Sequence, residues 1–202
     1  MTNQYEQLID IELTKSINKK LSSFSYKDDG NFYNVLLGAD VMKIHAFVHG
    51  LKTVLGQGFF QTISYKMAKL KYKNDLVERE KLIGNSGTRA DLVIGKLAFQ
   101  LKSSLSSFNK AMSLQQKKDF QIWEENGYTP ISATMIDSDV QTYFLDNLKP
   151  YKHVGAFDFW KLIGDENTYS ILMELASKFQ KRLLTDGIFK EIRNENLWEK
   201  FC

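Results

Sequence analysis

The chain of 202 residues contains 27 basic and 24 acidic side chains, so its formal net charge is +3, and 43% of its residues are hydrophobic. This composition excludes an intrinsically disordered chain, and the length fits one domain spanning residues 1–202. Residues 1–13 contain acids where a secretory signal has a basic start, and no run approaches the roughly 20 apolar residues of a membrane span. We therefore expect a cytoplasmic protein with no membrane association. Its single cysteine, Cys202, fits a reducing compartment.

The positive charge is concentrated in the middle of the sequence. Residues 43–102 carry 11 basic and 4 acidic side chains, whereas the segments before and after them are each net negative. Such a surface attracts nucleic acid, because phosphate neutralisation by Lys and Arg supplies most of the non-specific binding energy. The same lysines can equally solvate one face of a helix. Charge alone therefore leaves both interpretations open.

The first predicted elements are helical and are followed by a hairpin. Apolar residues recur at helical spacing over residues 43–70, with an interruption at Gly56-Gln57-Gly58. This pattern predicts two consecutive helices or one broken helix. Residues 89–102, RADLVIGKLAFQLK, contain two short apolar runs around Gly95-Lys96, which is the pattern of a tight β-hairpin.

A helix, a buried strand and further helices are predicted after the hairpin. Residues 105–123 follow a helical face that ends near Asn126-Gly127, and residues 131–136, ISATMI, are typical of a buried strand. The C-terminal third has apolar residues before Gly164 and then a long amphipathic segment over residues 169–183. We expect an α/β fold with a mixed β-sheet flanked by helices and with helical N- and C-terminal parts.

Three polar side chains of the predicted hairpin indicate a catalytic site. A two-residue loop at Gly95-Lys96 places Asp91 opposite Gln100, with Cβ atoms about 5 Å apart. Strand side chains alternate, so Gln100 and Lys102 point to the same face as Asp91. Carboxylate and amide oxygens can hold Mg²⁺, and Lys102 can orient or activate the attacking water. The metal would stabilise charge on a phosphate, which predicts phosphodiester hydrolysis without a covalent intermediate.

A hairpin with one solvated face is the alternative, because an Asp followed nine residues later by Gln-x-Lys arises often by chance in a lysine-rich chain. The apolar strands around this face favour catalysis, since helices that cover a sheet leave little solvent for its polar groups.

The order of these segments resembles a known nuclease superfamily. A helix, then ADLVI at residues 90–94, then a strand with Gln100 and Lys102, then a helix and a strand, is similar to the core of PD-(D/E)xK nucleases. Over residues 43–180 the chain resembles bacterial type II restriction endonucleases, in particular a group that cuts GGNCC-like sites. The resemblance implies a restriction-endonuclease-like fold and Mg²⁺-dependent, site-specific cleavage of double-stranded DNA, with Asp91, Gln100 and Lys102 as the catalytic residues.

The chain departs from the family at the metal site. The family usually has Glu where this chain has Gln100, and this change removes a negative charge, although some members of the superfamily also carry Gln. A family acid on the preceding helix would fall near Gln61, again an amide. The expected metal ligands are therefore Asp91, Gln100 and Gln61. Glu78 or Glu80 is an alternative source of the missing carboxylate, ranked below Gln61.

The predicted DNA-binding residues flank the motif. Ser103 and Ser104 can bond a phosphate or cap the next helix, and polar residues of that helix can contact DNA or simply face solvent. The predicted set is Arg89, Ser103, Ser104, Asn109, Lys110 and Lys117.

The resemblance also defines the expected partners. A compact domain that reads a palindromic site works most simply as a homodimer, because two-fold protein symmetry matches two-fold site symmetry. A cognate DNA methyltransferase is expected in the same restriction system but not as a stable partner. The alternatives are a structure-specific repair or recombination nuclease of the same superfamily, a DNA-binding protein that has lost cleavage, and an α/β domain unrelated to nucleic acid. The amides at Gln61 and Gln100 argue for the second alternative.

Overall fold

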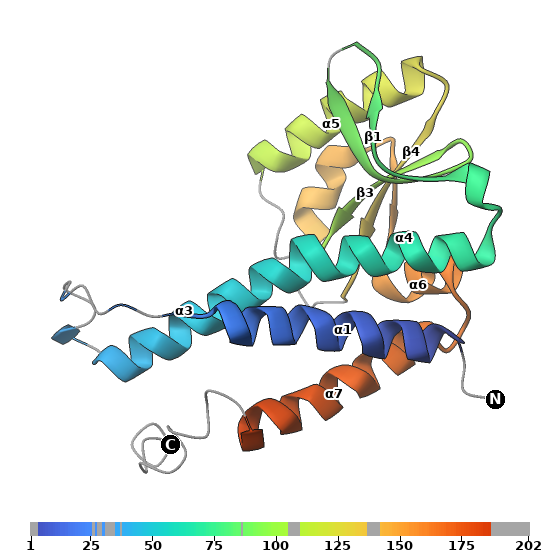
Figure 1. Cartoon of the computed structure of the whole chain (residues 1–202). Helices are drawn as coiled ribbons and strands as arrows, with labels where there is room; N and C mark the ends of the chain where they lie inside the picture. The colour runs from blue at the N-terminus through green and yellow to red at the C-terminus, as the bar shows by residue number, and fades with distance from the viewer. Residues whose placement is uncertain are drawn as a thin grey trace. The chain divides into compact units, whose positions relative to one another are not determined.

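The chain forms two compact units, which are described separately. The computed structural model (Figure 1) describes residues 4–25, 27, 30, 35–36, 38–85, 87–104, 110–136 and 142–186. Unit 1 comprises residues 1–8 and 60–169, and unit 2 comprises residues 9–59 and 170–202. That residues 1–202 act as one domain stays a prediction. Within the described residues, no helix combines the length and the apolar composition needed to span a lipid bilayer.

Unit 1 is built on a mixed five-stranded sheet with the strand order β1-β2-β3-β4-β5. Its strands are β1 (Val77–Ile83), β2 (Thr88–Ile94), β3 (Leu97–Lys102), β4 (Thr129–Thr134) and β5 (Lys152–Val154). The first three strands are antiparallel neighbours, whereas β4 is parallel to β3, and β5 is parallel to β4. Parallel strands need a long crossover, which helix α5 (Lys110–Glu125) provides between β3 and β4.

Helices cover both faces of this sheet (Figure 1). The other helices of unit 1 are α4 (Phe60–Lys71) and α6 (Ala156–Ile163), with short helical turns η2 (Asn74–Leu76) and η4 (Thr142–Leu148). Phe120 of α5 belongs to a buried cluster that includes Ala98. The next residue of β3, Phe99, points to the opposite face and contacts Phe159 of α6, with ring centroids 5.8 Å apart. Since α6 packs against α4, the two helices lie on the face opposite α5.

Unit 2 is helical and contains residues from both terminal parts of the chain. It takes most of α1 (Gln4–Ser23), all of α3 (Ala39–Thr53), the π-helical turn η1 (Val54–Phe59) and most of α7 (Thr168–Asp186). Ile9, Leu13 and Ile17 recur every four residues and are buried, so they form the apolar stripe of α1. The mixed sheet with its flanking helices and the helical terminal parts confirm the predicted α/β fold class.

The predicted hairpin and helix interruption are both found. Ile94 pairs with Leu97, and φ at Gly95 is 59°, so the loop has two residues, with a left-handed first residue as in a type II′ turn. The glycines of residues 56–58 lie in η1, between α3 and α4. A π-helical turn accommodates an extra residue without ending the helix, so the second predicted alternative, one broken helix, is the one observed.

Two strands were missed. Four of the seven residues of β1, VEREKLI, are charged, so this strand lacks the apolar alternation by which strands are detected. The other, β5, has only three residues.

Candidate functional site

A cluster of polar side chains surrounds the carboxylate of Asp91 on β2. Gln61 of α4 donates from Nε2 to Oδ1 at 3.0 Å. Gln100 of β3 donates from Nε2 to Oδ2, and the backbone N–H of Leu101 donates to the same oxygen at 2.7 Å. Three elements therefore meet at one carboxylate, and the structure brings the predicted residues Gln61, Asp91 and Gln100 together.

Asp91 lies where the regular pairing of β2 is interrupted on both sides. The ladder between β2 and β3 ends at the pair Leu92–Phe99. If the pairing continued, the Leu101 N–H would donate to the backbone of β2, but it donates to the side chain of Asp91 instead. On the other side, the ladder between β1 and β2 has no pair between Glu80 and Asp91. The Leu101 N–H is thus satisfied by a side chain and not by the neighbouring strand.

Burial raises the pKa of Asp91 to about 6. The Leu101 hydrogen bond and the nearby charges of Lys102 and Arg79 act in the opposite direction, whereas the Glu80 carboxylate raises the pKa further. A half-buried carboxyl with a raised pKa beside an ammonium group is typical of functional sites. The ammonium belongs to Lys102, so the third predicted catalytic residue also lies at the cluster.

Arg79 of β1 was missed by the sequence analysis. Its Nη1 donates to Oγ1 of Thr62 on α4 at 3.1 Å, next to Gln61 in the chain. Its Nε is buried and has no hydrogen-bond partner among the described residues. Arg79 lies in a run of charged residues that no sequence pattern identifies as a strand. Its contact with α4 could therefore not be predicted from the sequence.

The cluster contains carboxylate and amide oxygens, and Mg²⁺ prefers oxygen ligands. In the structure both side-chain amides present Nε2 to Asp91. Rotation about the last side-chain bond of Gln61 and Gln100 exchanges nitrogen for oxygen without moving the backbone. Within the described part of the chain, no group of three His, Cys, Asp or Glu side chains could hold a metal ion. A cation at Asp91 would therefore depend on amide oxygens.

The predicted DNA-binding residues lie on β2, directly after β3 and on α5. Arg89 is exposed on β2, two residues before Asp91. Ser103 and Ser104 are half-buried directly after β3. Lys110 is the exposed first residue of α5, and Lys117 is half-buried on the same helix. The remaining predicted residue, Asn109, lies outside the described residues.

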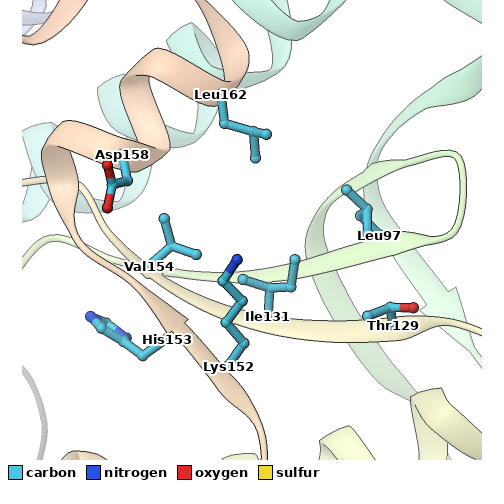
Figure 2. A pocket seen from close by; sticks show the side chains of 8 residues that line it. All are labelled: Leu97, Thr129, Ile131, Lys152, His153, Val154, Asp158 and Leu162. Carbon is cyan, nitrogen blue, oxygen red and sulfur yellow. The ribbon is translucent and has the colours of Figure 1, made fainter.

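A pocket of about 380 Å³ lies elsewhere on unit 1 (Figure 2). Leu97 and Ile131 contribute apolar surface, and Lys152 and Asp158 contribute charged groups. Leu97 begins β3, whereas Gln100 and Lys102 lie at the other end of that strand. The pocket is thus separate from the Asp91 cluster, which lies toward the carboxyl end of β3.

The fold and the cluster were compared with known proteins. No family model, no curated protein and no solved structure matches the chain. The resemblance to type II restriction endonucleases stays a prediction, and function is inferred from the geometry of the chain itself.

Proposed function

We propose that the chain is a type II restriction endonuclease that hydrolyses phosphodiester bonds in double-stranded DNA at a specific site with Mg²⁺. The convergence of Gln61 and Gln100 on the carboxylate of Asp91 carries this proposal. These residues come from α4, β2 and β3, and the charge of Lys102 acts on the same carboxylate. A solvated hairpin face would not bring an amide from a separate helix onto the acid.

Each residue of the cluster has a role in this reaction. Asp91 and the amide oxygens of Gln100 and Gln61 would hold Mg²⁺, which stabilises negative charge on the phosphate and lowers the pKa of a bound water. Lys102 carries an ammonium group that can orient that water or neutralise the phosphate. Arg79 holds Thr62, and this contact positions α4 and therefore Gln61.

The charge distribution supports duplex DNA as the substrate. Arg89 is exposed on β2, two residues before Asp91, and a cation there would contact a phosphate. Lys110 and Lys117 of α5 are the further proposed phosphate contacts. A homodimer would place one active site on each strand of a palindromic site. We further propose a cytoplasmic location and a cognate methyltransferase that protects the host DNA without forming a stable complex.

Cleavage of a sequenced phage DNA tests the proposal. The wild-type chain, Lys102→Ala and the matched control Lys96→Ala are incubated with the DNA at low salt, with Mg²⁺ or with a chelator. Lys96 is an exposed lysine in the hairpin loop. We expect discrete bands with the wild type and the control, and a loss of about 100-fold or more in rate with Lys102→Ala. DNA that stays intact and unretarded would contradict the proposal.

A DNA-binding protein without cleavage is the second candidate. The observation that favours this candidate is that Gln61 and Gln100 both donate N–H groups to Asp91. These hydrogen bonds occupy carboxylate lone pairs that a cation would need. This candidate predicts DNA retardation that is indifferent to Mg²⁺. Gln100→Glu separates the two candidates: a nuclease should then cleave at lower Mg²⁺ concentration, whereas a binder should still leave the DNA intact.

A further inference from the structure

We propose that the pocket of unit 1 in Figure 2 is the interface between two copies of the chain, and that each copy inserts Phe157 into the pocket of the other. The second copy therefore completes the pocket. This inference rests on the homodimer of the proposed function and specifies the surface through which the two copies associate. The Asp91 cluster takes no part in it, so association can be measured without DNA or metal.

The pocket lies at the amino-terminal ends of the three parallel strands. β3, β4 and β5 each contribute their first residue, and α6 contributes one side. The apolar part of the lining consists of Leu97, Ile131, Val154 and Leu162. Three further lining residues are exposed: Thr129, Lys152 and Asp158. A small molecule here would stay partly in water, whereas a typical ligand pocket buries about 70–90% of its ligand. The open rim fits a protein surface better.

Lys152 and Asp158 give the pocket two opposite charges that the chain itself does not pair. Figure 2 shows Lys152 pointing into the pocket and Asp158 at its side on α6. Within the described residues neither forms an ion pair, and Lys161 of the same helix pairs with Glu166 instead, at 2.7 Å. A two-fold axis can bring Lys152 of each copy to Asp158 of the other. The surface around the pocket is thus complementary in charge to itself.

Phe157 supplies the apolar group that the pocket lacks. It precedes Asp158 on α6, and its side chain is 46% exposed, whereas Phe159 and Trp160 of the same helix are fully buried. Successive residues of a helix point about 100° apart, and Phe157 does not line the pocket of its own chain. Aromatic side chains that fill an apolar pocket of a partner are typical anchors of protein interfaces. Phe157 is therefore available to a second copy.

Association of the full chain, measured by sedimentation velocity over a concentration series without DNA or metal, tests the inference. The wild type should form a reversible dimer, because one pocket on each copy is a small interface. Lys152→Glu and Asp158→Lys should each weaken the dimer about tenfold or more, since each places like charges at both contacts. The matched control Lys118→Glu reverses an exposed lysine of α5, on the other face of the sheet, and should dimerise like the wild type.

A mixture of the two charge variants separates a lost contact from a damaged fold. Both positions are acidic in Lys152→Glu and both are basic in Asp158→Lys, so an equimolar mixture should form a heterodimer with opposite charges at each contact. Damaged folds would not associate in this way. Phe157→Ala should also weaken the dimer about tenfold or more while keeping the melting temperature, because the side chain is exposed in the single chain.

A wild type that stays monomeric at every concentration would overturn the inference. Charge variants or Phe157→Ala that dimerise like the wild type would also overturn it, and so would a mixture that stays monomeric. None of these results decides whether the chain cleaves DNA, because cleavage is measured separately with Lys102→Ala. Dimerisation as expected together with DNA that stays intact and unretarded would contradict the proposed function and leave the interface standing.

Discussion

Asp91 accepts several hydrogen bonds and nevertheless has a raised pKa. Three N–H groups donate to its two oxygens, yet burial raises the pKa to about 6 from the usual 3.8 of a solvated aspartate. The folded state therefore binds the proton more tightly than the unfolded state does. Its contribution to stability is fully present below about pH 4 and is lost as the pH rises through 6.

Asp91→Asn should make the protein more stable at pH 8. The amide oxygen can accept from Gln100 and Leu101, and its nitrogen can donate to Gln61 once the Gln61 amide turns. The gain is at most about 3 kcal/mol, the equivalent of the pKa shift. Urea unfolding of variant and wild type at pH 8 and at pH 4 measures it. A gain of the same size at both pH values would show that ionisation of Asp91 is not its cause.

At the scale of elements, the hairpin of β2 and β3 determines whether the site forms. Its two-residue loop sets the register that brings Asp91 against Gln100, and a slip of one residue would turn every side chain of one strand to the other face. Gly95 takes a left-handed φ of 59° in this loop. A Cβ atom added there would meet no atom within 4 Å, so any penalty for a side chain comes from the backbone alone.

Gly95→Ala should lower the free energy of unfolding by about 1 kcal/mol, and Gly95→Asn by less, because Asn tolerates the left-handed conformation better than Ala. Denaturant unfolding measures both values. Gly58→Ala is a suitable comparison, since Gly58 lies in a helical segment without a positive φ and also has free space around a Cβ atom. That variant should be as stable as the wild type or more stable. Equal stability of Gly95→Ala and the wild type would contradict the turn assignment.

At the scale of the whole molecule, the basic segment of residues 43–102 is divided between the two units. Residues 43–59 belong to unit 2, and residues 60–102 belong to unit 1. A run of charge in the sequence is therefore not by itself one binding surface. Arg89 is the basic residue of this segment that we expect to bind DNA beside the proposed active site, because it is exposed on β2 two residues before Asp91.

Arg89→Ala should weaken duplex binding by a similar factor on all sequences and reduce the slope of log affinity against log salt by about 1. Binding titrations at several salt concentrations in the presence of a chelator measure both effects. Lys96→Ala, at the hairpin loop, should leave the slope unchanged. If both variants keep the wild-type slope, Arg89 does not contact a phosphate.

The sequence predicted the antiparallel hairpin, the helix after it and the buried strand β4, because turn residues and periodic apolar side chains are local signals. It predicted neither β1 nor β5, since one is rich in charged residues and the other is very short. The part of the site that lies on the hairpin was predictable for the same local reason. Gln61 was named from a family resemblance, and its bond to Asp91 spans 30 residues of sequence.

The sequence by itself therefore determined the class of fold and the meeting of Asp91 with Gln100, because hairpin register depends on two loop residues and on the alternation of side chains. Only the tertiary structure decided that Gln61 joins them and that Arg79 contacts Thr62 beside it. Both contacts depend on how α4 packs on the sheet. This packing has no local pattern in the sequence, because it joins elements distant in the chain.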